Sequence, residues 1–158
     1  MDPCAGMLCS ILQFLAAAAE EQIAFCGDRL PEHASDMLLP PGVPVDDERR
    51  YAIHQVEQEG NSLLLLAGQF GDYWPIVSNL PENTLEPGET LLDEILCLLE
   101  LMIWFQGNNQ AYSRFWGKDA LRDAVEWRLV RRLARRALTE LDWPLTLPAT
   151  TFGHLLYM

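Results

Sequence analysis

The chain has 158 residues and a formal net charge of −12 at pH 7. Hydrophobic residues make up 49% of it and charged residues 22%, a balance that is typical of a globular protein and excludes a disordered chain. Its length predicts a single domain over residues 1–158. A net charge of this size repels nucleic acid and anionic lipid and attracts cationic partners, so we predict no nucleic-acid partner and no membrane partner.

The N-terminal segment 7–19 is apolar and has the length of a signal peptide. However, Asp2 precedes it where a signal peptide carries basic residues, and Glu20 and Glu21 follow it directly. We therefore predict a cytoplasmic protein, with a first helix from about residue 3 to residue 26 that ends at Gly27.

The four cysteines, Cys4, Cys9, Cys26 and Cys97, have no zinc-ligand spacing. We predict that all four are reduced thiols, which is usual for a cytoplasmic protein. A disulfide from Cys26 to Cys4 or Cys9 is the alternative. Cys26 lies near the predicted end of a helix, where the helix dipole disfavours a thiolate, so it should be a poor nucleophile.

The middle of the chain contains two segments that predict irregular structure and, between them, one that favours a helix. Residues 38–45 contain three prolines and predict a loop. Residues 46–60 begin with acidic residues and end at Gly60, which favours a helix; the alternative is a small β-hairpin within residues 50–70. Residues 68–89 contain three prolines and three glycines in a segment that we expect to be mostly irregular.

Residues 91–105 form an apolar run that is too short to span a bilayer and contains three carboxylates. Its apolar residues occupy almost every side of a helix, so we expect other helices to surround it, namely the first helix and the arginine-rich helix described next. The fold class predicted from these elements is mainly α, a single-core bundle of about five helices with long irregular loops; a mixed α+β fold with the hairpin at residues 50–70 is the alternative.

The segment 127–138 carries five of the ten arginines of the chain. They recur with the spacing i, i+3, i+4, i+7 and i+8, which places them on one face of a helix: Arg128, Arg131, Arg132, Arg135 and Arg136. Only Arg136 has an acidic residue four positions later, Glu140. We therefore expect acidic segments elsewhere in the chain, such as 46–48 or 82–89, to pair with the arginines; contact of the arginines with a separate acidic protein is the alternative.

Aromatic and acidic residues gather in turn-rich sequence at 71–77 and 108–116. An aromatic anchor with an acidic rim is typical of a protein-binding hot spot; the alternative is that the aromatic residues cap the core. The predicted partner-binding residues are Asp72, Tyr73, Trp74, Glu82, Glu86, Glu89, Tyr112 and Trp116.

No motif of the sequence predicts a reaction or a cofactor, so we do not expect an enzyme. The alternative is a helical metal-binding protein or enzyme that uses His54 and Glu57, which share a helical face and could bind a metal together with Asp93 or Glu100. The function predicted from size and charge is that of an acidic non-enzymatic protein that binds and neutralises a basic protein partner. This plan resembles that of bacterial immunity and antitoxin proteins in size and charge only. A subunit of a larger assembly, including a homo-oligomer, is a further alternative.

Overall fold

The computed structural model describes residues 3–27, 30, 32, 62–80, 85–104 and 115–148. These residues contain helices and no β-strand, which confirms the mainly α fold class. The helix predicted at residues 46–60 lies outside the described residues. The alternative hairpin is wrong for residues 62–70, because this half of it is helical.

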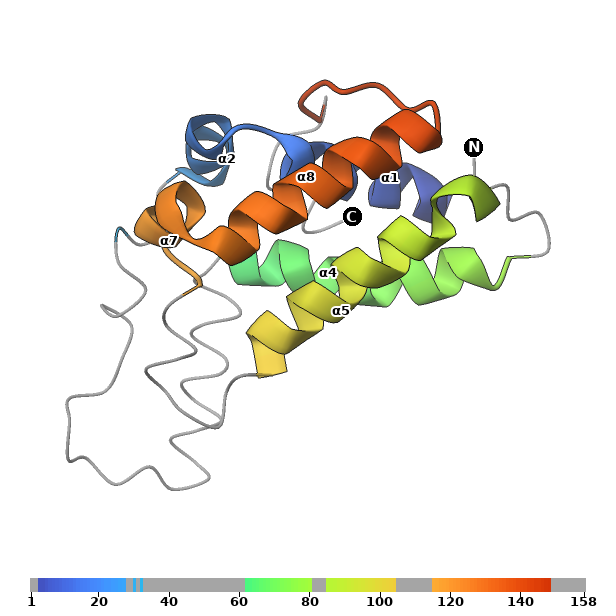
Figure 1. The fold of residues 1–158 in the computed structure, drawn as a ribbon, viewed down its shortest axis with the longest axis horizontal. Helices are drawn as coiled ribbons and strands as arrows, with labels where there is room; N and C mark the ends of the chain where they lie inside the picture. The colour runs from blue at the N-terminus through green and yellow to red at the C-terminus, as the bar shows by residue number, and fades with distance from the viewer. Residues whose placement is uncertain are drawn as a thin grey trace.

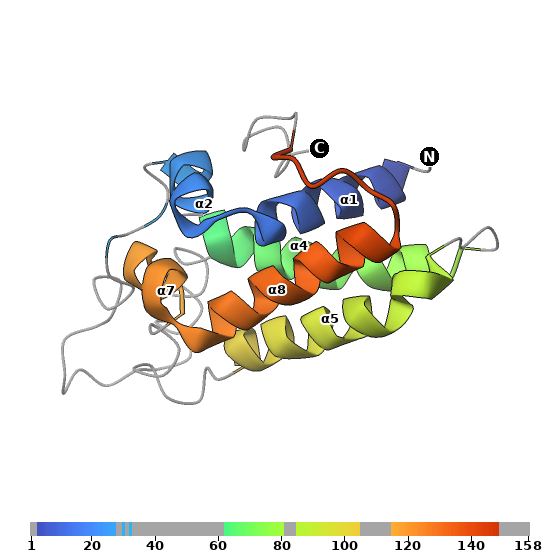
Figure 2. The same ribbon diagram turned by 45° about the horizontal axis from the view of Figure 1, so that its top comes forward.

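Four long helices form a closed bundle in which each helix packs on two neighbours, as Figures 1 and 2 show. In order around the bundle they are α1 (Pro3–Ala16), α4 (Ser62–Ser78), α5 (Glu89–Trp104) and α8 (Val125–Glu140). The 3₁₀ turn η3 (Glu86–Gly88) leads into α5 and packs against α8. Two short helices, α2 (Ala19–Cys26) and α7 (Lys118–Asp123), pack against each other beside the bundle.

One hydrophobic core joins all four long helices. In α1 the fully buried leucine and isoleucine side chains repeat at helical spacing: Leu8, Ile11, Leu12 and Leu15. Burial of each side chain of this size contributes about 1.5–3 kcal/mol relative to leaving it in water. The core continues beneath the start of α8, where the indoles of Trp116 and Trp127 meet edge to face with ring centroids 5.7 Å apart.

The prediction that residues 68–89 are mostly irregular is wrong for α4, which continues helical to Ser78 across Pro75. Proline inside a helix costs about 3 kcal/mol because it removes a backbone hydrogen bond and crowds the preceding turn. Trp74 and Val77, on either side of Pro75, are each 2% exposed. Their burial in the core requires the helical register and offsets this cost.

The prediction of one continuous first helix over residues 3–26 is wrong, because two helices occupy this segment. The chain becomes extended at Ala18 (ψ 153°), which separates α1 from α2. It does so again at Ala124 (ψ 133°), which separates α7 from α8. The predicted stop at Gly27 is confirmed, because this residue ends α2 with φ at +61°, a conformation that glycine adopts readily.

Gly88, the residue before α5, touches Leu141, the residue after α8, and α5 and α8 lie side by side and run in opposite directions. A Cβ atom on residue 88 would lie 2.9 Å from Cγ of Leu141. This close contact explains why the turn before α5 has no side chain at position 88.

We predict that Gly88→Ala lowers the free energy of unfolding by about 1–3 kcal/mol, because the new methyl group overpacks the contact with Leu141. The matched control is Gly68→Ala in α4, where a Cβ atom would meet no atom within 4 Å and helix propensity predicts a gain of up to about 1 kcal/mol. Urea unfolding measures both. Equal stability of the two variants would contradict the packing at Gly88.

Candidate binding face

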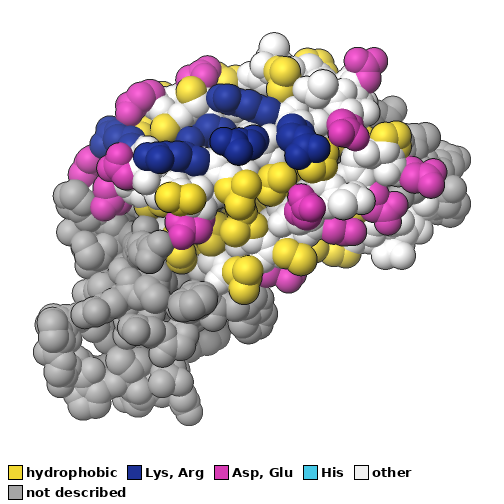
Figure 3. Space-filling view, in the orientation of Figure 1, with side chains coloured by type: hydrophobic (Ala, Val, Ile, Leu, Met, Phe, Trp, Pro, Cys, Tyr) yellow, Lys and Arg dark blue, Asp and Glu magenta, His cyan; other side chains and the backbone are white. Residues whose placement is uncertain are grey.

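α8 is a two-sided helix, as the sequence predicts. One side is buried in the core: Trp127, Val130, Leu133, Ala134, Ala137 and Leu138. The opposite side carries the five arginines, which line one open hollow of about 360 Å³ and form the dark blue strip in Figure 3. We call Arg128, Arg131, Arg132, Arg135 and Arg136 the arginine strip.

Arg131 is anchored to the fold by Gln22 of α2, whose side chain is fully buried. The Nε2 group of Gln22 donates hydrogen bonds to the carbonyl oxygens of Phe14 (3.0 Å) and Leu15 (3.1 Å). Its Oε1 atom accepts hydrogen bonds from Nη2 (3.1 Å) and Nε (3.4 Å) of Arg131. Nη2 of Arg131 also donates to the carbonyl oxygen of Leu121 at 2.7 Å. The amide of Gln22 thus links α1, α2 and α8 through polar groups that burial would otherwise leave unsatisfied.

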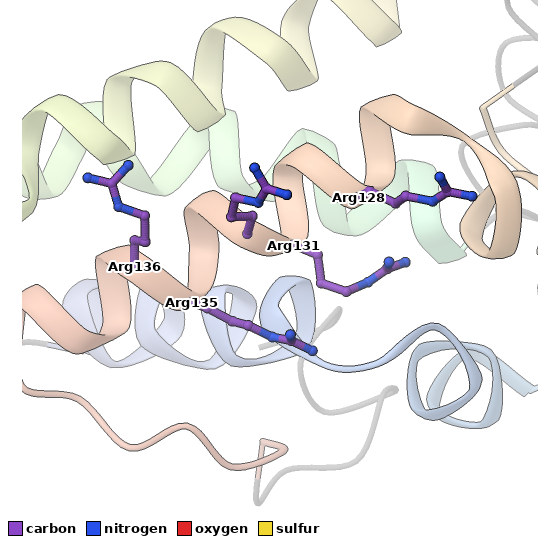
Figure 4. A pocket seen from close by; sticks show the side chains of 5 residues that line it. Arg128, Arg131, Arg135 and Arg136 are labelled. Carbon is purple, nitrogen blue, oxygen red and sulfur yellow. The ribbon is translucent and has the colours of Figure 1, made fainter.

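Arg135 is anchored in the same region, because its Nε donates a hydrogen bond to the carbonyl oxygen of Ala16 at 2.8 Å. The carbonyls at the end of α1 lack partners within the helix and carry the negative end of its dipole. The guanidinium group of Arg135 donates a hydrogen bond to one of these carbonyls and places a positive charge at the negative end of the dipole. Figure 4 shows Arg131 and Arg135 directed toward the junction of α1 and α2, whereas Arg136 points toward α5.

The predicted pairing of the arginine strip with acidic residues of the same chain is wrong for the described carboxylates. None of them, including Glu86 and Glu89, lies within ion-pair distance of a strip arginine, and Arg136 does not pair with Glu140. The acidic segment 46–48 and Glu82 lie outside the described residues. The strip lies on the far side of α8 from the core, and the described acidic residues border it without reaching it (Figure 3).

The described internal ion pairs belong instead to Arg122 of α7, which meets Glu20 and Glu32 at 2.9 Å each. Hydrogen bonds to Glu20 and Glu32 raise the pKa of Arg122, and the bond to Glu20 has the larger effect. All three side chains are well exposed, so solvent screens each pair, and the pairs orient α7 on α2 more than they stabilise the fold.

The arginine strip therefore presents positive charge that no described carboxylate neutralises. Burial, together with the neighbouring charges of Arg135 and Arg128, lowers the pKa of Arg131. The like charges of Arg135 and Arg128 repel Arg131, so negative charge placed over the strip would be favourable.

An apolar groove of about 500 Å³ runs along the strip, between α5 and α8. Its lining residues are Thr90, Asp93, Glu94, Cys97, Leu98, Leu101, Leu129 and Leu133. Leu101 is 59% exposed and Leu129 is 42% exposed, and Figure 3 shows the hydrophobic band below the dark blue strip. The expectation that other helices surround α5 is thus wrong within the described residues, because α5 packs on α4 and α8 and leaves this side open.

Two of the predicted partner-binding residues lie in the core: Trp74 and Trp116 are each 2% exposed. The indole of Trp74 donates a hydrogen bond to Asp93 at 2.8 Å. As folded, neither indole has a surface to offer a partner, which agrees with the alternative that these aromatic residues cap the core. Tyr73 is half-buried in the same helix as Trp74.

The predicted acidic residues that the structure describes lie at the surface, unlike the two tryptophans. Asp72, Glu86 and Glu89 are exposed, on α4, η3 and the first residue of α5. Glu82 and Tyr112 lie outside the described residues. For the exposed carboxylates, the role in partner binding stays a prediction.

The alternative metal site rests on His54 and Glu57, which lie outside the described residues, as do His33 and His154. In the described part of the chain, no three side chains of the metal-ligating types gather in one place. Asp93 and Glu100 are both exposed on α5, and Asp93 is engaged by Trp74.

None of the four cysteines, all of which are among the described residues, forms a disulfide in this structure. Burial raises the pKa of the Cys26 thiol to about 11, and a hydrogen bond with Ser62 opposes this shift. Burial also raises the pKa of Cys9. Cys26 is therefore protonated at neutral pH, and its inertness comes from burial rather than from the helix dipole alone.

Comparison with known proteins gives no further guide to the site, because no protein-family model, curated protein or solved structure matches the chain. Within the described residues, no helix combines the length and the apolar character needed to cross a membrane.

We predict that Gln22→Ala lowers the free energy of unfolding by about 2–4 kcal/mol, because it leaves the buried carbonyl of Leu15 without its donor and removes one acceptor of Arg131. The matched control is Gln13→Ala: Gln13 makes one exposed hydrogen bond, to the carbonyl oxygen of Pro144 at 3.2 Å, so its loss should cost less than about 1 kcal/mol. Thermal and urea unfolding give both values. A similar loss in the two variants would show that the Gln22 linkage does not stabilise the fold.

The raised pKa of Cys26 predicts a loss of stability at alkaline pH. Because the folded state favours the protonated thiol, this stabilisation is complete below the ordinary pKa of 9.0 and is lost as pH rises to about 11. Between about pH 8 and pH 11, the wild type should lose about 2 kcal/mol more than Cys26→Ala. Unfolding curves of both proteins across this range measure the difference, and parallel pH profiles would disprove it.

Proposed function

We propose that the chain is a non-enzymatic cytoplasmic protein that binds and neutralises a basic protein partner, in the manner of a bacterial immunity or antitoxin protein. The observation that supports this proposal is the separation of charge in the fold. Every described lysine and arginine lies within residues 118–136, and α1, α2, α4, η3 and α5 contain none.

The described charged residues of α4, η3 and α5 are consequently all acidic. The exposed carboxylates are Asp72, Glu86, Glu89, Asp93, Glu94 and Glu100. The fields of neighbouring carboxylates add, and such a surface draws a basic protein toward it and raises the association rate.

Asp72 and Glu86 are the most useful residues for locating this surface, because both are exposed and lie on separate elements. Tyr73 is only partly buried next to Asp72 and offers an aromatic edge beside the charge, a combination that is frequent at protein interfaces. The metal-binding alternative at His54 and Glu57 stays a prediction, which metal analysis of the purified protein with and without His54→Ala would decide.

We predict that the double variant Asp72→Lys/Glu86→Lys loses at least about tenfold in capture of basic proteins from a lysate of the native host. Mass spectrometry of the captured proteins, scored by their isoelectric points, is the measurement. Capture by the wild type should also fall when salt is raised, since screening shortens the reach of the field.

The matched control is Glu21→Lys/Asp123→Lys, which makes the same change in net charge at exposed positions of α2 and α7, away from α4 and η3. Capture lost equally in both variants would show that net charge, not this surface, is responsible. No enrichment of basic proteins by the wild type would refute the proposed function itself.

A further inference from the structure

The groove between α5 and α8 has an apolar floor and opposite charges on its two edges. Leu98, Leu101, Leu129 and Leu133 supply the apolar lining, and Asp93 and Glu94 lie on the α5 side. We infer that this groove is the interface of a homodimer, covered by the same groove of a second copy of the chain.

The arginines form the other edge of the groove. Arg132 and Arg136 each follow a groove leucine by three residues, after Leu129 and Leu133 respectively. Side chains at this spacing are neighbours on a helix surface, and Figure 4 shows Arg136 directed toward α5. The two guanidinium groups make no hydrogen bond or ion pair with a described residue, so they are available to carboxylates from outside the chain.

Charge complementarity identifies a second copy as the occupant. When two copies are related by a two-fold axis that runs along the groove, α5 of each copy lies over α8 of the other. Carboxylates then face arginines along both edges, and the exposed leucines meet between them. A two-fold axis across the groove would instead place α5 on α5 and α8 on α8, which sets like charges together.

The available area is sufficient for a modest dimer. α5 and α8 have 16 residues each, so each is roughly 24 Å long. Side by side they span roughly 20 Å. The paired faces therefore bury on the order of 1,000 Å² in total, which is the lower limit for a specific interface. Leu101 and Leu129 are about half exposed in the monomer, and the dimer would remove most of their contact with solvent.

A different protein fits this face less well, because it would need an apolar ridge flanked by basic groups on one side and acidic groups on the other. A second copy carries both signs at the required places. Bidentate pairing of arginine with carboxylate also gives the orientation that a shallow apolar contact alone does not fix.

The dimer can be tested by light scattering and analytical ultracentrifugation of the full chain, whose monomer mass is 17.9 kDa. We expect twice this mass at high protein concentration. The acidic variant Arg132→Glu/Arg136→Glu and the basic variant Thr90→Arg/Glu94→Arg should each be monomeric, because each makes both edges of the groove alike in charge. All four positions are exposed, and circular dichroism checks that the fold is kept.

Mixing the two variants is the decisive step. In a mixed dimer, the acidic α8 edge of the acidic variant faces the basic α5 edge of the basic variant. At the other edge, the native acidic α5 of the acidic variant faces the native basic α8 of the basic variant. We therefore expect a heterodimer to form only in the mixture, with an affinity within about tenfold of the wild type. Ala24→Glu and Ala24→Arg on α2, an exposed position outside the groove, are controls that should dimerise like the wild type.

A wild type that remains monomeric at every concentration would overturn the inference and leave the groove to a different protein. Dimers that persist in both charge variants, or folded variants that fail to associate when mixed, would also overturn it. These outcomes are independent of the proposed function, because capture of a basic partner is tested at Asp72 and Glu86, which do not line the groove.

Discussion

The hydrogen bonds between Gln22 and Arg131 are the constraint on which the arrangement of α8 depends. The break in the first helix leaves carbonyls at the end of α1 without their usual partners in the next helical turn. These carbonyls are nevertheless buried. Buried carbonyls need donors, and the amide of Gln22 supplies two hydrogen bonds while its own oxygen accepts from Arg131. This linkage joins α2 to α1, and it is compatible only with a rotation of α8 about its own axis that places Arg131 at the junction.

That rotation divides the arginine strip into two parts with different roles. Arg131 and Arg135 point toward α1 and α2 and bind backbone and amide oxygens. Arg132 and Arg136 fall on the other border of the strip, beside the groove. The positive charge on α8 is thus neither wholly structural nor wholly free. One row completes the end of a helix, and the other gives the groove its charged edge.

Periodicity in the sequence was sufficient to predict α8, α5 and the stop at Gly27, because each depends on local spacing or on the conformation of one residue. It did not predict the helix across Pro75, since the burial of Trp74 and Val77 that offsets the proline is a tertiary effect. The breaks at Ala18 and Ala124 carry no glycine or proline to mark them. The groove was missed for a related reason: Leu101 has the same pattern as the buried leucines of α5, and only the absence of a described third neighbour exposes it.

The two proposals are linked by electrostatics, although they concern different surfaces. A basic protein that approaches the carboxylates of α4 and η3 is repelled by the arginines across the groove, which lie within a few Debye lengths in a molecule of this size. Pairing of α5 with α8 of a second copy would place carboxylates over Arg132 and Arg136. These carboxylates would neutralise the two arginines and weaken their repulsion of the basic partner. The surfaces left exposed would then be more uniformly acidic than those of the monomer. Dimerisation at the groove would therefore strengthen the attraction on which the proposed capture of a basic partner depends.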